Sequence, residues 1–264
     1  MTLTAELPLV GSAVALALVA ILRALPWRER PAVLALTLAI GAFGGLAPVL
    51  AYPFVPPATL DLHALWEWSA VGGPTIQASY RLDGIGAIGA ALGTAYAVAS
   101  LFAATRSERS PLLPALVLAN GLATIALAVT DDLIASAVLL GVLATFTAAA
   151  TLLVAPPRAA ARIAAYLAFG LQGFVLAALL LSRFGGASFR FGDIRPTAIS
   201  PGIVLAASIG AALFAGLYPF VPWRYQRVRA RTHERETLRG LLAMPAGIGA
   251  SLVLLRLLGV TRTD

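Results

Sequence analysis

Eight stretches of mostly apolar residues, each about the length of a membrane-spanning helix, follow one another along this chain. The hydrocarbon core of a bilayer is about 30 Å thick, and a helix needs about 20 apolar residues to cross it. With 59% hydrophobic and 12% charged residues among its 264, the chain is more apolar than a soluble core requires. We therefore predict an all-α integral membrane protein with one membrane domain. The stretches are residues 8–26, 32–54, 83–104, 112–130, 133–154, 160–182, 199–218 and 239–259.

The arginines predict the orientation of these helices. All 19 basic residues are arginine, and they lie between the apolar stretches rather than in one patch. This distribution argues against nucleic-acid binding despite a net charge of +7. Loops rich in arginine face the cytoplasm, and an external N-terminus places four such loops there. The loop with Arg183, Arg190 and Arg195 is the exception. We expect a multi-pass protein of a prokaryotic cytoplasmic membrane.

The same pattern divides the chain into consecutive parts. We expect two N-terminal helices in residues 1–56, an outer loop in 57–82 and a five-helix core in 83–218. A break with a basic cytoplasmic segment follows in 219–238, and the last helix with its tail in 239–264. In the outer loop, Trp66 and Trp68 precede a Gly-Gly-Pro turn and a short alternating stretch, which predicts an interfacial turn or hairpin.

Acidic residues lie at the predicted ends of helices, and each has two interpretations. Asp83, with Arg81 just before it, is either a polar anchor for a partner subunit or a carboxylate that complements a helix dipole. Asp131 and Asp132 either attract cations or protons at the outer surface or form a solvated turn that caps the next helix. We favour the second interpretation in each case.

The predicted interior offers little chemistry. The chain has no cysteine and no lysine, and its histidines, His63 and His233, fall in predicted loops. We therefore expect no metal site, no cofactor and no catalytic residue. Thr145, Thr147, Asn120 and Gln172 are polar residues within the stretches, and we expect them to bond to nearby backbone or to neighbouring helices. Glycine pairs such as Gly89 and Gly93 predict close packing within the chain.

The stretch GLYPFVPW ends the seventh apolar run and precedes a run of arginines. Proline lacks an amide donor, so a helix must end or break there, and freed carbonyls need buried or watery surroundings. The arginines either contact an acidic partner or anionic lipid, or only set the topology. The break comprises Pro219, Phe220, Pro222 and Trp223, and the candidate contact residues are Arg224, Arg227, Arg229, Arg231 and Arg235.

Several stretches, the last of them residues 238–260, occur in an order that resembles the antiporter-like proton-translocating membrane subunits of respiratory complex I, membrane-bound hydrogenases and multisubunit cation/proton antiporters. YRLDGIGAIGAALG is similar to the start of the family's third helix, and the stretch with Tyr166 is similar to its sixth. GLYPFVPW resembles its Pro-Phe-His-x-Trp break, with Val221 in place of histidine. The matching residues are Arg81, Asp83, Gly84 and Tyr166, together with those of the break.

The resemblance also shows what this chain lacks. Gly141 stands where the family's fifth helix has glutamate, and Phe214 stands where its seventh has lysine. The family builds its channel from two inverted repeats of five helices, and this chain resembles the first repeat with a broken seventh helix. The resemblance therefore implies a truncated and degenerate member of the family.

The resemblance leads us to expect an accessory subunit in the membrane arm of a complex I-like or related ion-translocating assembly. Its role would be structural or sealing, beside antiporter-like chains that retain a Lys/Glu relay, and it would be at most a non-catalytic part of an oxidoreductase or translocase. One alternative is a half-size transporter of an ion or of inorganic carbon that completes a channel with a partner chain. Another is an assembly or lipid-binding protein.

Overall fold

A computed structural model of the chain describes residues 67–69, 75–77, 79–106, 112–183, 188–217 and 233–260, and the account below concerns these residues. Helices dominate the described part. The two short strands, β1 and β2, pair in antiparallel fashion, with Trp68 opposite Ile76. The elements are β1 (Glu67–Ser69), β2 (Thr75–Gln77), α3 (Gly84–Arg106), α4 (Leu112–Val129), α5 (Leu133–Val154), α6 (Pro157–Arg183), η3 (Pro196–Ala198), α7 (Pro201–Ala215) and α8 (His233–Val260).

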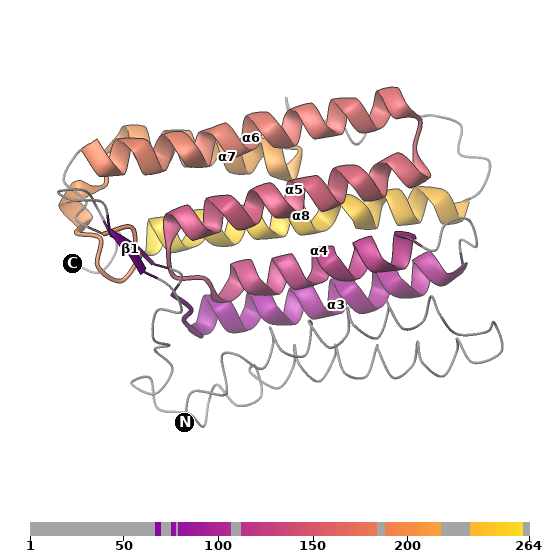
Figure 1. Cartoon of the computed structure of the whole chain (residues 1–264), viewed down its shortest axis with the longest axis horizontal. Coiled ribbons are helices and arrows are strands. Elements are labelled where there is room, and N and C mark those ends of the chain that lie inside the picture. Colours follow the sequence, from indigo (N-terminus) through magenta and orange to yellow (C-terminus); the bar gives the residue numbers. More distant parts are fainter. Residues whose placement is uncertain are drawn as a thin grey trace.

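The six described helices lie side by side along the long axis of the molecule (Figure 1). The pair α3 and α4 lies on one side of the pair α5 and α8, and the pair α6 and α7 lies on the other side. Consecutive helices run in opposite directions, so the start of α3 lies at the same end as the end of α8. The hairpin strand β1 lies at this end, which we call the hairpin end.

Among the described helices, α4, α5 and α6 are long and apolar enough to cross a membrane. Shorter apolar helices cover Gly84–Ser100, Pro201–Ala215 and Met244–Val260. The helical nature of the described chain and the presence of apolar helices of spanning length are thus confirmed. The count of eight spans and their orientation stay predictions, and the first two apolar stretches lie outside the described residues.

The predicted bounds of α3 to α6 agree closely with the helices found, because local signals mark their ends. Asp132 is the N-cap of α5, and its side chain accepts a hydrogen bond from the amide of Ala135. Ala155 ends α5, and Pro157 is the first residue of α6, a position that proline favours because its missing amide donor is not needed there.

The bounds of α7 and α8 differ from the prediction. α7 ends at Ala215 rather than at 218, because Gly216 adopts a left-handed conformation with φ of 60°. The amides of Gly216 and Leu217 donate to carbonyls of the last turn, which completes a glycine C-cap before Pro219 is reached. α8 begins at His233 rather than at 239, so His233 is helical, contrary to its prediction as a loop residue.

Glycines bring neighbouring helices into close contact. A Cβ atom at Gly173 of α6 would lie 2.6 Å from the carbonyl oxygen of Ala206 in α7, and one at Gly210 would lie 2.7 Å from that of Gly170. At Gly89 of α3, a Cβ atom would lie 2.6 Å from the Cβ of Ala128 in α4. The predicted intrachain packing role of Gly89 is therefore confirmed, and the tightest approach to backbone lies between α6 and α7.

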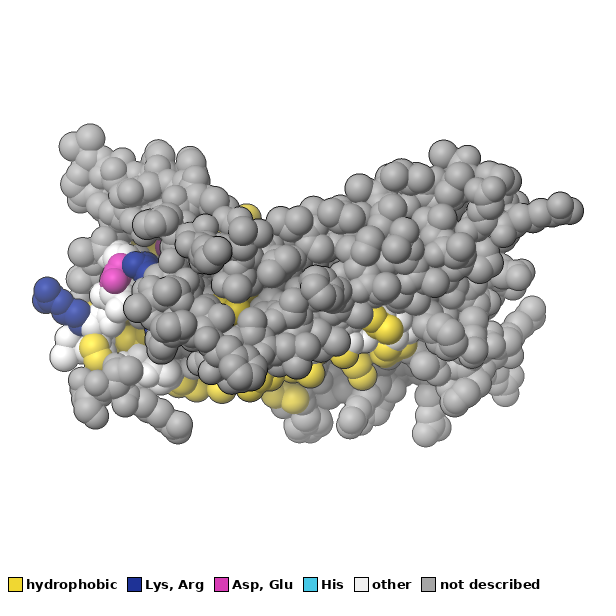
Figure 2. All heavy atoms as spheres, turned by 90° about the horizontal axis from the view of Figure 1, so that it is seen from below, with side chains coloured by type: hydrophobic (Ala, Val, Ile, Leu, Met, Phe, Trp, Pro, Cys, Tyr) yellow, Lys and Arg dark blue, Asp and Glu magenta, His cyan; other side chains and the backbone are white. Residues whose placement is uncertain are grey.

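The charged and apolar side chains are separated along the surface. On the face shown in Figure 2, the described arginine and acidic side chains gather at one end, and hydrophobic side chains extend along the length. Among the described residues, several large hydrophobic side chains are well exposed, as with Phe169 at 69%, Val138 at 63% and Leu205 at 62%. A surface of this kind suits a bilayer rather than water.

Candidate functional site: a charged cluster at the hairpin end

Two ion pairs lie at the hairpin end, where α3 and α5 begin and α4 and α8 end. Asp83 pairs with Arg256, and Asp131 pairs with Arg190. The four residues come from the start of α3, the α4–α5 connection, the α6–α7 connection and the last turns of α8. Residues from very different parts of the sequence thus form one electrostatic cluster.

Arg256 is the most deeply buried cation of the cluster, with 4% of the residue exposed. Its Nη2 lies 2.8 Å from Oδ1 of Asp83 and 3.4 Å from the carbonyl oxygen of Arg81. Its Nη1 donates to the carbonyl oxygen of Thr130, just after α4. One guanidinium therefore connects the beginning of α3, the end of α4 and α8. A cation at the end of α4 also complements the dipole of that helix.

Asp83 has a second role at the start of α3. Its Oδ1 accepts a hydrogen bond of 2.6 Å from the amide of Gly86, so the carboxylate also stabilises the first turn. The prediction of a helix N-terminal carboxylate is confirmed. The alternative role of Asp83, as a polar anchor for a partner subunit, stays a prediction; within the chain its carboxylate pairs with Arg256.

Asp131 is buried in the α4–α5 connection and pairs with Arg190. The distance from Arg190 Nε to Asp131 Oδ2 is 3.0 Å, and the Asp131 side chain is 3% exposed. Burial raises the pKa of Asp131 above its ordinary value, while the hydrogen bond from Arg190 and the charges of Arg256 and Arg81 act in the opposite direction. The cost of removing this carboxylate from water outweighs the attraction of its cationic neighbours.

The prediction of a solvated turn at Asp131 and Asp132 is wrong. The two residues are 2% and 0% exposed, respectively. The reason is that backbone segments enclose them on both sides. The amide of Asp131 donates a hydrogen bond to the carbonyl oxygen of Ser79, and the amide of Phe191 donates one to the carbonyl oxygen of Asp131. The capping role predicted for this pair is confirmed for Asp132.

These backbone contacts form a small hydrogen-bonded layer over the hairpin end. The backbone of Tyr80 forms an isolated antiparallel β-bridge with Thr130, and the backbone of Asp132 forms another with Arg190. The α4–α5 connection therefore lies between the segment before α3 and the segment after α6. Burial also raises the pKa of the Tyr80 side chain.

Arg190 belongs to the loop that contradicted the predicted orientation. Because its charge is paired with Asp131, it contributes less free positive charge to that loop than the sequence suggests. Arg183 and Arg195 of the same loop are exposed.

The family-motif residues lie in different parts of the fold. Asp83 and Gly84 are at the start of α3 in the cluster, and the exposed Arg81 precedes them. Tyr166 is half-buried in α6, more than a helical turn from either end of that helix. Among the described motif residues, those before and at the start of α3 lie at the charged cluster, and Tyr166 does not.

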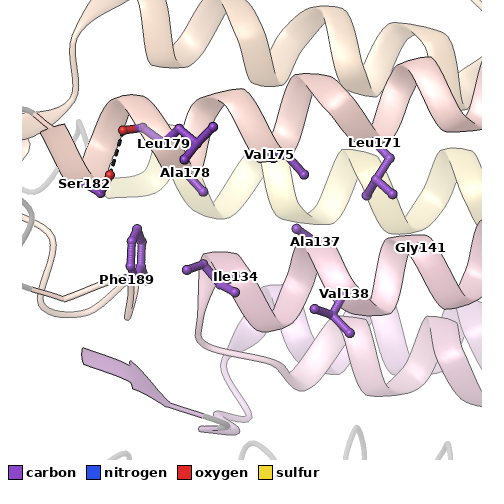
Figure 3. Close-up of a pocket in the computed structure, with 10 residues that line it drawn as sticks. All are labelled: Ile134, Ala137, Val138, Gly141, Leu171, Val175, Ala178, Leu179, Ser182 and Phe189. Carbon is purple, nitrogen blue, oxygen red and sulfur yellow. Dashed lines mark hydrogen bonds between the residues drawn. The ribbon is translucent and has the colours of Figure 1, made fainter. Parts of the chain in front are cut away.

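Gly141 lies beside an apolar pocket of about 330 Å³ between α5 and α6 (Figure 3). A Cβ atom at Gly141 would be 3.4 Å from Cδ2 of Leu171, so a small side chain has room there. Ser182 is the polar residue of the lining, and its hydroxyl donates to the carbonyl of Leu179. The lining residues are Ile134, Ala137, Val138, Gly141, Leu171, Val175, Ala178, Leu179, Ser182 and Phe189.

Phe214 is fully buried in α7, in the main hydrophobic core. Its ring lies edge-on to that of Phe174, with centroids 6.2 Å apart, and it packs against Gly170. Both phenylalanines belong to the main hydrophobic core. The two positions of the lost family charges thus lie in apolar surroundings, one beside a pocket and one in close-packed core.

A second group of polar residues is buried between α3, α4 and α5. Thr147 donates to Oδ1 of Asn120 at 3.3 Å, and Thr124 donates to the backbone of Asn120. The prediction that such groups bond to neighbouring helices and backbone is confirmed for Thr147 and for Thr145, which donates to the carbonyl of Gly141. The group contains no carboxylate and no cation.

The helix break and most of the arginine run lie outside the described residues. This applies to Pro219, Phe220, Pro222 and Trp223 and to Arg224, Arg227, Arg229 and Arg231. Arg235 lies in the first turn of α8. Among the described residues, no group of His, Asp and Glu is arranged to hold a metal ion.

Sequence reasoning missed Arg256, the residue on which the cluster depends. The interior was expected to contain only hydroxyls and amides, yet Arg256 lies inside the predicted stretch 239–259 and is buried. A signal was available, because a single arginine within an apolar stretch requires a partner. The identity of that partner, Asp83, was not readable from spacing. Comparison with known protein families and with curated proteins finds no match to this chain.

Proposed function

We propose that this chain is an accessory membrane subunit of a complex I-like or related ion-translocating assembly, with a structural or sealing role. The observation that carries the proposal is the confinement of charge. In the described chain, the acidic side chains lie at or beyond helix ends; of the buried ones, Asp131 is paired with Arg190 and Asp132 caps α5. A proton path across a bilayer needs titratable groups at intermediate depth.

The surroundings of the two lost family charges support this role. Gly141 adjoins an apolar pocket, and Phe214 packs against Phe174 and Gly170 of α6. The described bundle is packed as a barrier, with large apolar side chains such as Leu127, Leu140 and Leu143 fully buried at its centre. A barrier of this kind seals a membrane arm without conducting.

The deciding experiment is native mass spectrometry of the assembly extracted in mild detergent. We expect this chain to be recovered with redox subunits or with full-length antiporter-like subunits that retain a Lys/Glu relay. Recovery of the chain by itself, in membranes where such subunits are expressed, would contradict the accessory role. It would favour an independent transporter instead.

A second experiment tests the claim that the chain does not pump by itself. The double variant Gly141→Glu/Phe214→Lys restores the family charges, and we expect it to lower the yield of folded protein rather than to create proton flux. Gly259→Glu and Leu217→Lys are matched controls, because Gly259 has open space around it and Leu217 is 58% exposed. Uncoupler-sensitive proton flux in vesicles that contain only the double variant would refute this expectation.

A further inference from the structure

Gln172 is a polar side chain on the outward face of α6. It is exposed, and none of the hydrogen bonds found among the described residues involves its amide. Residues at helical spacing from it on the opposite face, Leu167, Phe174 and Leu181, are fully buried in the core. Gln172 therefore points away from its own bundle.

The arginines at the ends of α6 place Gln172 near the middle of the membrane. Arg162 and Arg183, both exposed, are separated by about 32 Å along the helix, from a rise of about 1.5 Å per residue. This separation matches a hydrocarbon core of about 30 Å. Gln172 lies about midway between the two arginines, so its amide is about 15 Å from either boundary.

The exposed hydroxyl groups of α5 and α6, unlike the amide of Gln172, have hydrogen-bond partners within their own helices. The hydroxyls of Thr145 and Ser182 donate to carbonyls of their own helices. A primary amide has two N–H donors and a carbonyl acceptor. Leaving these groups without partners in hydrocarbon costs several kcal/mol, so the position calls for a hydrogen-bonding partner from outside the chain.

The residues around Gln172 suit close contact with another helix. Ala161, Ala165 and Ala168 lie on the same exposed stripe at spacings of four, three and four residues. Small residues allow the backbones of membrane helices to approach, and amides then bond across the interface. Leu176, which is 49% exposed, continues the stripe beyond Gln172.

We propose that this stripe of α6 is the contact surface for α6 of a second copy of this chain. The amide is self-complementary: its N–H donates to the carbonyl of a like amide, and its carbonyl accepts in return. A two-fold axis along the membrane normal places both copies of Gln172 at the same depth. A parallel α6 pair therefore satisfies both amides at the level where each lacks a partner.

Cysteine cross-linking in native membranes tests the contact, because the chain has no cysteine of its own. With Ala168→Cys, oxidation should give a covalent dimer in several-fold higher yield than with Val138→Cys or Leu205→Cys. These control positions are also exposed but lie on α5 and α7. Adding Gln172→Leu should lower the dimer yield several-fold, and Gln172→Asn should restore part of it. Equal yields with Leu and Gln at position 172, or across the three cysteine positions, would overturn the proposal.

A photoreactive benzophenone residue in place of Leu176, with Gln172 intact, identifies the neighbour. A cross-linked peptide from this same chain supports the second copy. An adduct with a different protein, or with lipid only, overturns it. Because the Gln172 side chain is exposed and has no hydrogen bond within the described chain, Gln172→Leu should leave the thermal stability of the monomer in detergent unchanged, so a lower cross-linking yield reports on the interface. The result is independent of whether other subunits are recovered in the proposed assembly.

Discussion

The two ion pairs at the hairpin end are opposite in burial. In Asp83–Arg256, the arginine side chain is 3% exposed and the carboxylate 29%. In Asp131–Arg190, the carboxylate is 3% exposed and the arginine 28%. The difference matters because arginine keeps its charge in proteins, whereas a buried carboxyl group can become neutral by binding a proton. Loss of the more exposed partner therefore has different consequences in the two pairs.

The largest effect is expected when Arg256 loses its partner. Asp83→Asn leaves a buried guanidinium charged and without its ion-pair partner, and we expect the free energy of unfolding to fall by about 3–5 kcal/mol. The double variant Asp83→Asn/Arg256→Met should recover much of this loss, because no uncompensated charge remains. Reversible unfolding in mixed micelles measures both. A double variant as unstable as Asp83→Asn would show that the hydrogen bonds of Arg256, rather than its charge, dominate.

Removal of Arg190 should be less costly, and its cost should depend on pH. Arg190→Gln leaves Asp131 buried without its cation, which raises the pKa of Asp131 further. Near pH 4 the carboxyl group can bind a proton, and we expect a loss of about 1 kcal/mol. Near pH 8 the buried carboxyl group must either stay charged without its cation or bind a proton from a dilute solution. We therefore expect Arg190→Gln to lower the free energy of unfolding by about 2–3 kcal/mol at this pH. A loss of stability that does not change with pH would contradict the claim that Asp131 is a buried carboxyl group that binds a proton when Arg190 is removed.

Replacement of arginine by lysine distinguishes the two pairs by geometry. Arg256 donates to three oxygens, on Thr130, Arg81 and Asp83, which one ammonium group on a flexible chain cannot reproduce. We expect Arg256→Lys to lower the free energy of unfolding by about 2 kcal/mol. Arg190→Lys should cost less than about 1 kcal/mol, since Arg190 is partly exposed and bonds to Asp131 through one nitrogen. Similar losses for both variants would remove the distinction.

The smallest expected effect is the pH dependence contributed by Asp131 itself. Its pKa in the folded protein is raised above the ordinary value of 3.8. The folded state therefore binds the proton more tightly than the unfolded state, and the associated stability is present below about pH 4 and is lost as pH rises through the raised pKa. Asp131→Asn should remove this dependence, a difference of about 1 kcal/mol or less. The free energies of unfolding of the native protein and of Asp131→Asn, measured from pH 3 to pH 7, give this difference. If both change with pH in the same way, Asp131 does not contribute the expected pH dependence.

Most helix bounds were predictable because apolar length and local end signals agree in this sequence. Asp132 and Pro157 mark helix starts by their own chemistry. The end of α7 was misplaced because the prolines after it were taken as the stop, whereas the left-handed Gly216 already ends the helix. Backbone conformation at one glycine among 24 is not readable from composition.

The cluster was less predictable than the helices. Asp83 and Arg256 are 173 positions apart, and Asp131 and Arg190 are 59 apart. Helix packing decides which of these charges meet, and a sequence read by spacing alone has no access to that packing. Burial of Asp131 depends in addition on backbone from two other connections, which explains why a turn between two helices was expected to be solvated.

The long separation between Asp83 and Arg256 has a consequence for synthesis at the ribosome. A growing chain inserts α3 and α4 well before α8, so Asp83 has no ion pair with Arg256 until most of the protein has been translated. The cluster can therefore close only when the last described helix enters the bundle. In a ribosome-arrested chain that lacks α8, Asp83 and the carbonyl of Thr130 should be accessible to water. Insertion of α8 brings in Arg256, which bonds to both groups and completes the bundle.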